Sequence, residues 1–290
     1  MRIAVASGKG GTGKTTVAVN LALSLQHGER VRFIDCDVEE PNAHLFLKPR
    51  IDQVTEATIP VPRVDEERCT SCGMCAEVCA YNALAVITGK NGVKGRVLVF
   101  DHLCHGCGAC ARLCPARAVR EEGMRIGVIE AGRAGPLAFA QGRLDVGRIM
   151  SPPLIRQLKE RALPWGGNTR TAGEDGEEVL ILDAPPGTSC PVIAAVRGCD
   201  RCILVTEPTP FGMHDLELAA GMLRRLGVPA GVVINRDGVG DQGVERFCEE
   251  YGLPVLLRIP FSEEIASLYA RGIPVVGELP GMEQRFRELY

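Results

Sequence analysis

The sequence predicts an α/β protein with a doubly wound, mostly parallel sheet, and three observations support this prediction. Apolar segments with strand character alternate with segments whose apolar residues recur at helical spacing. Several strand segments are continuously apolar, as in Val179–Leu182, which indicates burial on both faces and therefore a parallel sheet. Right-handed crossovers between such strands give the doubly wound topology. Eight of the thirteen cysteines fall between residues 69 and 114, which indicates a small inserted domain.

The expected elements follow in chain order. Strand Ile3–Ala6 leads into helix Lys14–Gln26, whose Val17, Leu21 and Leu25 share one face, and strand Val31–Ile34 comes next. Beyond the cysteines we expect strand 125–130, helix 152–162, strand 179–182, helix 190–197, strand 202–206, helix 213–226, strand 230–234, helix 241–251, strand 255–258 and helix 262–271. The stretch from Pro164 to Glu178 is rich in glycine and charge, which predicts a surface loop.

A chain of 290 residues can form a well-buried α/β domain and a small insert. We place the insert at residues 61–122, entering at Pro60–Pro62 and leaving near Glu121–Gly123. Residues 1–60 and 123–290 then form the α/β domain.

Composition excludes several classes of protein. A formal net charge of −3 argues against a nucleic-acid binder, which needs basic residues to neutralise phosphates. The first residues, Met1–Ala6, have the pattern of a buried strand that leads into a phosphate loop and not that of a signal peptide. No apolar stretch approaches the roughly 20 residues of a membrane span. We therefore expect a cytoplasmic protein whose cysteines bind metal rather than form disulfides.

Residues Gly8–Thr15 match the phosphate-loop pattern G-x-x-x-x-G-K-[ST] between a strand and a helix. Lys14 is expected to reach the β- and γ-phosphates of ATP or the β-phosphate of ADP, and Thr15 to present its hydroxyl to Mg²⁺. Asp183 ends a buried strand before Pro-Pro-Gly and should bind Mg²⁺ through water. The full set expected around the nucleotide phosphates is Gly8, Gly10, Gly11, Thr12, Gly13, Lys14, Thr15 and Thr16.

The additional Lys9, in Lys-Gly-Gly-Thr-Gly-Lys-Thr, resembles the deviant phosphate loop of the MinD/ParA/nitrogenase-iron-protein superfamily, a SIMIBI-type class of P-loop NTPases. Asp35–Asp37 is similar to the first switch of that family, Asp183–Gly187 to its second switch, and Ile259–Val275 to the C-terminal segment of MinD. The resemblance covers everything outside the insert.

This resemblance implies a homodimer, or a heterodimer with a related ATPase, formed face to face around two ATP molecules. Lys9 would contact the nucleotide of the partner subunit, and Asp37 would orient or deprotonate the attacking water. Asn235 would recognise adenine, with Pro260 and Phe261 lining the base pocket. Asp35 would either support the metal shell or cap the following turn.

The cysteines of the insert form two runs of the pattern C-x2-C-x2-C-x3-C, repeated at an offset of 35 residues. This spacing houses [4Fe-4S] clusters, and two complete runs argue against zinc. The insert resembles the small α+β fold of bacterial two-cluster ferredoxins, in which the fourth cysteine of each run serves the other cluster. The resemblance implies one cluster on Cys69, Cys72, Cys75 and Cys114, and a second on Cys104, Cys107, Cys110 and Cys79. Ala80 departs from the family pattern, which has proline there.

Five cysteines lie outside the insert. Cys190 follows Asp183 by seven residues, a spacing similar to that of the cluster-binding cysteine of the nitrogenase iron protein. It either contacts metal or is a small buried residue at a helix start. Cys36, Cys199, Cys202 and Cys248 are expected in the core, although the Cys199/Cys202 spacing also resembles the bridging pair of cluster carriers.

The predicted function is an ATPase that couples a nucleotide-dependent dimer switch to electron transfer through two [4Fe-4S] clusters to a redox partner. The alternative is an ATP-dependent iron–sulfur cluster carrier of Mrp type, whose partner is a cluster-accepting protein. The C-terminal helix carries Met282, Phe286, Leu289 and Tyr290 on one face but has balanced charges, which favours packing on the body over a stable membrane anchor. A third possibility is a positioning ATPase whose clusters only staple the insert, but the missing basic anchor helix argues against a membrane-bound version. Amide synthesis would require a glutaminase domain for which no length remains.

Overall fold

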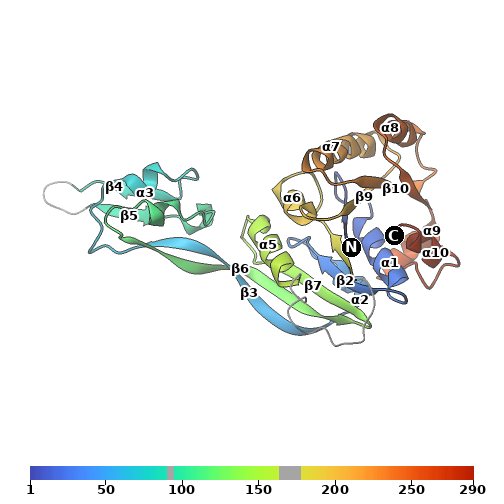
Figure 1. Ribbon diagram of the computed structural model, residues 1–290, viewed down its shortest axis with the longest axis horizontal. Coiled ribbons are helices and arrows are strands. Elements are labelled where there is room, and N and C mark those ends of the chain that lie inside the picture. The colour runs from blue at the N-terminus through green and yellow to red at the C-terminus, as the bar shows by residue number, and fades with distance from the viewer. Residues whose placement is uncertain (90–94, 163–177) are drawn as a thin grey trace. The chain divides into compact units, whose positions relative to one another are not determined.

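The computed structural model describes residues 1–89, 95–162 and 178–290. The chain divides into two compact units, which are described separately (Figure 1). Unit 1 comprises Met1–Thr55, Ile129–Arg143 and Ile155–Tyr290, and unit 2 comprises Glu56–Val128 and Leu144–Leu154. The boundaries expected at residues 60 and 123 fall inside the strands β3 (Arg50–Val64) and β6 (Val119–Ala134). Of the loop expected over 164–178, only Glu178 belongs to the described residues.

A nine-stranded sheet has the order β11-β10-β9-β1-β8-β2-β7-β6-β3. Every neighbouring pair from β11 to β7 is parallel, which confirms the predicted α/β fold with a mostly parallel sheet. Its strands besides β3 and β6 are β1 (Arg2–Ala6), β2 (Arg30–Asp35), β7 (Leu137–Leu144), β8 (Glu178–Asp183), β9 (Arg201–Thr206), β10 (Ala230–Asp237) and β11 (Val255–Pro260).

One face of the sheet packs against helices from both ends of the chain. Ile3, Val5 and Phe33 of the strands join a continuous apolar cluster with α1 (Lys14–Leu25), α2 (Ala43–Leu47), α9 (Glu263–Ala270) and α10 (Met282–Arg287). The helices α6 (Cys190–Val196) and α7 (Pro210–Leu226) contact β1, β8 and β9, and their buried residues lie outside this cluster, so they cover the opposite face. Two further helices outside the cysteine-rich segment are α5 (Ser151–Ala162) and α8 (Gly243–Tyr251), the latter packed against α7.

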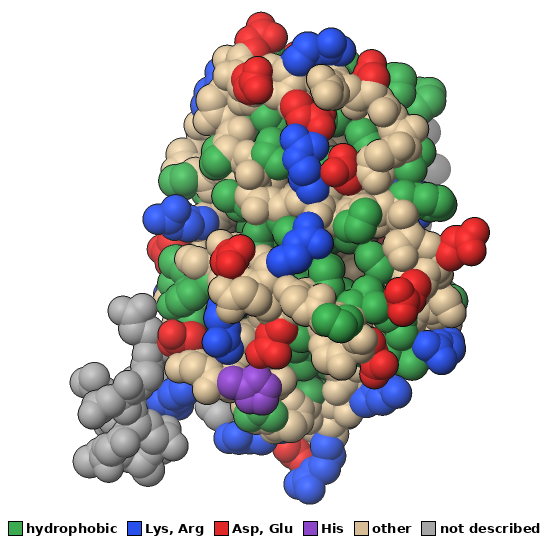
Figure 2. Space-filling view, turned by 90° about the vertical axis from the view of Figure 1, so that its right-hand side faces the viewer, with side chains coloured by type: hydrophobic (Ala, Val, Ile, Leu, Met, Phe, Trp, Pro, Cys, Tyr) green, Lys and Arg blue, Asp and Glu red, His purple; other side chains and the backbone are tan. Residues whose placement is uncertain are grey.

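The C-terminal helix α10 packs against α1, as expected from its balanced charges. Phe286 is fully buried and Met282 is 5% exposed, and burial of each side chain contributes about 1.5–3 kcal/mol to the fold. Figure 2 shows Lys and Arg side chains interspersed with Asp and Glu on the face of unit 1 that includes α8, α9 and α10. Among the described residues, no helix combines the length and apolarity needed to cross a bilayer.

Unit 2 is built from two copies of one small motif. Its elements are α3 (Met74–Glu77), β4 (Leu84–Ile87), β5 (Arg96–Val99), the 3-10 turn Asp101–Leu103 and α4 (Ala109–Arg112), with β4 and β5 antiparallel. Left-handed backbone recurs at an offset of 35 residues, at the pairs Ser71/Gly106, Gly73/Gly108 and Asn82/Arg117. Ser71 adopts this conformation (φ 56°) where its counterpart is a glycine, at a cost of roughly 1–2 kcal/mol. The sequence repeat is therefore also a repeat of backbone conformation.

Candidate functional site

The phosphate loop is clamped between β1, α7 and β10. A Cβ on Gly8 would lie 2.2 Å from the carbonyl oxygen of Asp215 in α7, so only glycine fits there. Gly13 has a φ of 94° at the start of α1, and a Cβ on it would lie 2.5 Å from Nδ2 of Asn235. Beside Gly10 and Gly11, by contrast, the space is open. Close packing at the two ends of the loop holds its backbone N–H groups in place around a phosphate.

Lys14 is buried at the first position of α1 and is 7% exposed. Burial lowers the pKa of its ammonium group, and the negative charges of Asp183, Asp37 and Asp35 oppose that shift. The Oγ1 atom of Thr12 is also buried and has no hydrogen-bond partner among the described residues. The Thr12 hydroxyl thus has unused hydrogen-bonding capacity in the loop, and the Lys14 ammonium group supplies positive charge for an anionic ligand.

Two carboxylates meet at the carboxyl edge of the sheet, where Asp35 of β2 is in register with Asp183 of β8. Asp35 accepts hydrogen bonds from the backbone N–H groups of Asp37 at 3.0 Å and of Asn42 and Ala43, each at 3.1 Å. Asp35 therefore caps the turn that leads into α2, which is one of the two roles expected for it. Burial, followed by the charge of Asp183, raises the pKa of Asp35 well above its usual range.

Asp183 and Asp37 have a different environment. Burial raises the pKa of Asp183 to about 7, and the nearby Thr15 hydroxyl and Lys14 ammonium lower it in part. Neither carboxylate oxygen of Asp183 accepts a hydrogen bond of ordinary geometry from the described residues. Burial raises the pKa of Asp37 to about 6, partly offset by Lys14. An orphaned buried carboxylate beside a threonine hydroxyl is the donor set that Mg²⁺ prefers, so these residues fit the ion.

Lys9 contacts a residue that the sequence patterns did not identify. Its Nζ lies 3.5 Å from Oε2 of Glu207, which follows β9, and Oε1 of Glu207 lies 2.9 Å from Nη1 of Arg236. Glu207 is 6% exposed. The signal that could have identified it is an acidic residue directly after a buried parallel strand, at the same sheet edge as Asp183.

The residues expected around the base lie at the ends of β10 and β11. Asn235 donates from Nδ2 to the carbonyl oxygen of Thr12 at 2.8 Å, so it supports the phosphate loop. The backbone N–H of Phe261 donates to the carbonyl oxygen of Asp237 at 3.0 Å, and the Phe261 ring is 61% exposed. Pro260, in β11, is also exposed. Both side chains are thus available at the edge of the sheet that carries the phosphate loop.

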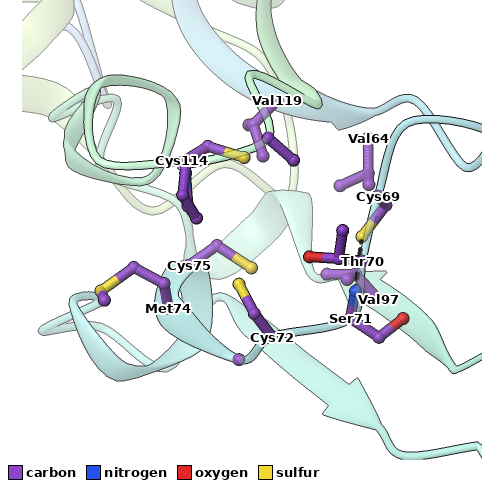
Figure 3. Close-up of a pocket in the computed structure, with 13 residues that line it drawn as sticks. Val64, Cys69, Thr70, Ser71, Cys72, Met74, Cys75, Val97, Cys114 and Val119 are labelled. Carbon is purple, nitrogen blue, oxygen red and sulfur yellow. Dashed lines mark hydrogen bonds between the residues drawn. The ribbon is translucent and has the colours of Figure 1, made fainter.

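In unit 2, cysteines from both runs surround a small space that we call the first cavity. Its cysteines are Cys69, Cys72, Cys75 and Cys114. Figure 3 shows their sulfur atoms around a common space, with the sulfur of Met74 pointing away. Valines complete the lining, namely Val64, Val97 and Val119. The charges that raise the pKa of the Cys75 thiol, after the larger effect of burial, are those of Cys69 and Cys114.

The second cavity is lined by Cys79, Cys104, Cys107 and Cys110. Burial raises the pKa of Cys110 to about 11 and also raises that of Cys104. No three His, Cys, Asp or Glu side chains in the described part of the chain converge closely enough to hold a single metal ion. Each of the two cavities brings together three cysteines of one run and the fourth cysteine of the other. Four thiols around one space suit an iron–sulfur cluster.

The remaining cysteines divide into two groups. Cys36, Cys199, Cys202 and Cys248 are buried, as expected of core residues. Cys190 is exposed at the start of α6. The interpretation of Cys190 as a buried residue at a helix start is therefore wrong, because its side chain faces solvent just after Asp183–Gly187.

Comparison with known families gives one match over most of the chain. The family model described as the CobQ/CobB/MinD/ParA nucleotide binding domain matches residues 3–275. An uncharacterised protein of Methanocaldococcus jannaschii is 29% identical over 290 residues, covering 100% of this chain and 95% of its own length. The iron–sulfur cluster carrier protein of Pyrococcus horikoshii is 26% identical over 291 residues, covering 95% of this chain and 79% of its own.

Solved structures show the same fold. The septum site-determining protein MinD of Pyrococcus horikoshii, complexed with Mg-ADP, superposes with a TM-score of 0.58 at 19% identity, covering 99% of this chain and 93% of that one. A ParA family ATPase of Chlorobium tepidum also gives a TM-score of 0.58, at 13% identity, over 100% and 97% of the two chains.

Proposed function

Because the chain belongs to the CobQ/CobB/MinD/ParA nucleotide-binding family and is a P-loop ATPase, we propose that it couples ATP hydrolysis to electron transfer through two [4Fe-4S] clusters. The observation that carries this proposal is that unit 2 of the same chain brings its eight cysteines into two cavities of four. Cysteine sets held by the fold in this way suit resident clusters that pass electrons one at a time to a redox partner.

The residues of unit 1 divide the nucleotide chemistry among them. The loop N–H groups and Lys14 bind the phosphates, while Thr15 and Asp183 would hold Mg²⁺, which neutralises charge on the phosphate oxygens. Asp37 would hold the attacking water. Its pKa of about 6 leaves the carboxylate mostly ionised near neutral pH, so it can accept a proton from that water.

Dimer formation would move Lys9. In the single chain Glu207 holds its ammonium group, and in the dimer Lys9 would reach the phosphates of the partner's nucleotide. We expect Lys9→Ala to bind ATP normally but to lose MgATP-dependent dimerisation in sedimentation experiments. Normal dimerisation of this variant would show that Lys9 does not act across the interface.

A second candidate function is an ATP-dependent iron–sulfur cluster carrier. Relatives from Aquifex aeolicus and Pyrococcus horikoshii bear the name iron–sulfur cluster carrier protein, at 25% and 26% identity. The exposed Cys190 next to the second switch would supply a ligand for a transferable cluster. Against this function, sites in which four thiolates are held by the fold release their metal reluctantly.

Iron retention distinguishes the two functions. Protein isolated without oxygen is incubated with an apo-ferredoxin acceptor and a chelator, with and without MgATP, and Lys14→Ala serves as the nucleotide-free control. Electron transfer predicts that the irons of both clusters stay bound under all conditions. Iron that moves to the acceptor only with MgATP, and not from Cys190→Ser, would instead establish the carrier function.

A further inference from the structure

We propose that the two cavities hold their clusters at different reduction potentials, and that the carboxylate of Glu121 gives the cluster in the second cavity the lower potential. This inference rests on the proposed function only in requiring a [4Fe-4S] cluster in each cavity. It follows from comparing the two copies of the motif position by position.

The hydrogen bonds to sulfur are matched between the copies. In the first cavity the sulfur of Cys69 accepts from the N–H of Ser71 at 3.4 Å, and that of Cys114 accepts from Ala118 at 3.2 Å. In the second cavity the corresponding distances are 3.4 Å from Gly106 to Cys104 and 3.3 Å from Ala83 to Cys79. N–H donors of this kind tune cluster potentials, and here they contribute equally to both.

The side chains that line the cavities are not matched. Apart from its cysteines, the first cavity is lined by uncharged residues, and a Cβ on Gly73 would meet open space. In the second cavity Glu121 takes part in the lining, and a Cβ on Gly108, the counterpart of Gly73, would lie 3.1 Å from its Oε1. The carboxylate thus lies against Gly108, which stands between Cys107 and Cys110 in the chain.

Other charges near the second cavity are compensated. Asp101 acts on the Cys104 sulfur, but Arg63 binds both of its oxygens, at 2.7 and 2.9 Å. Glu122, next to Glu121 on β6, pairs with Arg120 at 2.9 Å and lies outside the lining. No ion-pair partner of Glu121 occurs among the described residues, so its charge acts on the cavity uncompensated.

An aromatic pair adds to the difference. Tyr81 and His105 stack at the second cavity with ring centroids 3.5 Å apart and planes 7° from parallel, where the first copy has Ala116 and Thr70. Tyr81 is 43% exposed and His105 is also exposed, but two rings cover more of the cavity than an alanine and a threonine do. The local dielectric should therefore be somewhat lower there, which strengthens the effect of a nearby charge.

A reduced cluster carries one more negative charge, and a nearby carboxylate disfavours it. Because Glu121 is exposed, solvent screens part of this effect. We expect roughly a tenfold preference of an electron for the first cavity, which equals about 59 mV for one electron. After a low-potential donor protein supplies a single electron, that electron would leave the second cluster, oxidising it, and reduce the first, with no proton transferred.

The test is a redox titration of anaerobic protein at pH 8 and low salt, followed by EPR and visible absorbance. The wild-type protein should titrate in two one-electron steps about 59 mV apart or more. Glu121→Gln should raise the lower potential and leave the higher one in place. Glu122→Gln removes the same charge from the same strand outside the cavity and should change neither step.

Three outcomes would overturn the inference alone, provided that iron analysis finds both clusters: a single potential in the wild type, no shift in Glu121→Gln, or an equal shift in Glu122→Gln. Protein that binds too little iron for two clusters after anaerobic reconstitution would overturn the proposed function, and this inference with it.

Discussion

The phosphate site of unit 1 and the cysteine cavities of unit 2 are held together by different forces. The phosphate loop follows β1, and the neighbouring Ile3, Val5 and Val17 are at most 2% exposed within a large apolar core. Around the cavities, the buried residues are three of the cysteines, two alanines and one leucine, namely Cys75, Ala83, Leu84, Cys104, Cys110 and Ala118. Apolar packing therefore prepares the nucleotide site before its ligand arrives, whereas the cavities depend on the groups they bind.

Removal of the clusters should unfold the cavities of unit 2 and leave unit 1 intact. Oxidation with ferricyanide in the presence of EDTA would leave four uncoordinated thiols in each cavity and little apolar core around them. We expect the part of unit 2 over residues 56–128 to become sensitive to protease, while unit 1 still binds ATP. Limited proteolysis with mass spectrometry, combined with an ATP-binding assay, measures both. Loss of ATP binding together with the clusters would show that the two units are not independent.

The reverse experiment is Lys14→Ala. The buried ammonium group of Lys14 is surrounded by three carboxylates, and Lys9, the other lysine of the loop, pairs with Glu207. ATP affinity should therefore fall by at least about 100-fold, equal to about 2.7 kcal/mol. Calorimetric titration with ATP measures the loss. Iron content and EPR spectra should match those of the wild type, and a drop in iron content would show that the nucleotide site supports unit 2.

The central elements of unit 1 were predictable because continuous apolar strands and amphipathic helices leave clear patterns. Strand β3 (Arg50–Val64) was missed because it contains Pro60 and Pro62 and leaves most of its first half exposed. Strand β7 contains Gly142 and follows Gly135–Pro136, which is typical of a turn. Helix α2 has only five residues, and Asp35 caps it from the end of a strand seven or eight residues earlier.

The residues of the candidate site were predictable only where a motif fixes them. Gly8, Lys14 and Asp183 each stand in a short pattern with a physical reason for every position. Glu207 belongs to no such pattern, and its contact with Lys9 depends on how β9 ends beside the phosphate loop. The contrast between the uncharged lining of the first cavity and Glu121 in the second is equally hard to predict, because the offset of 35 residues relates the cysteine runs but not the strands beside them.

Asp183→Asn tests whether the buried carboxylate of the nucleotide site destabilises unit 1. In metal-free protein burial raises the pKa of Asp183 to about 7, against about 3.9 for an unfolded aspartate. The folded state then holds a proton that the unfolded state has lost. The free energy of unfolding should therefore fall as pH rises from about 4 through 7, by on the order of 4 kcal/mol from this residue.

Chemical denaturation at pH 5 and pH 8 in EDTA, followed by far-ultraviolet circular dichroism, measures this pH dependence of the unfolding free energy. Asp183→Asn should weaken this pH dependence and abolish MgATP hydrolysis. The part of the pH dependence that remains should come from Asp35 and Asp37. An unchanged pH dependence in the variant would place the titrating group elsewhere.

The smallest expected effect concerns Ala80, which stands where the second run has Pro115. Because the two runs share their backbone conformation at three pairs of left-handed positions, proline should fit at residue 80 without strain. Ala80→Pro would restrict the unfolded chain and stabilise unit 2 by about 0.4–1 kcal/mol. Protease resistance of the cluster-free protein measures this gain, with Ala116→Pro, one residue beyond Pro115, as a control at a position that has no such precedent. If cluster ligation dominates the stability of unit 2, the same substitution should leave the cluster-loaded protein almost unchanged. A large gain in the loaded protein would mean that the chain, more than the metal, holds this unit together.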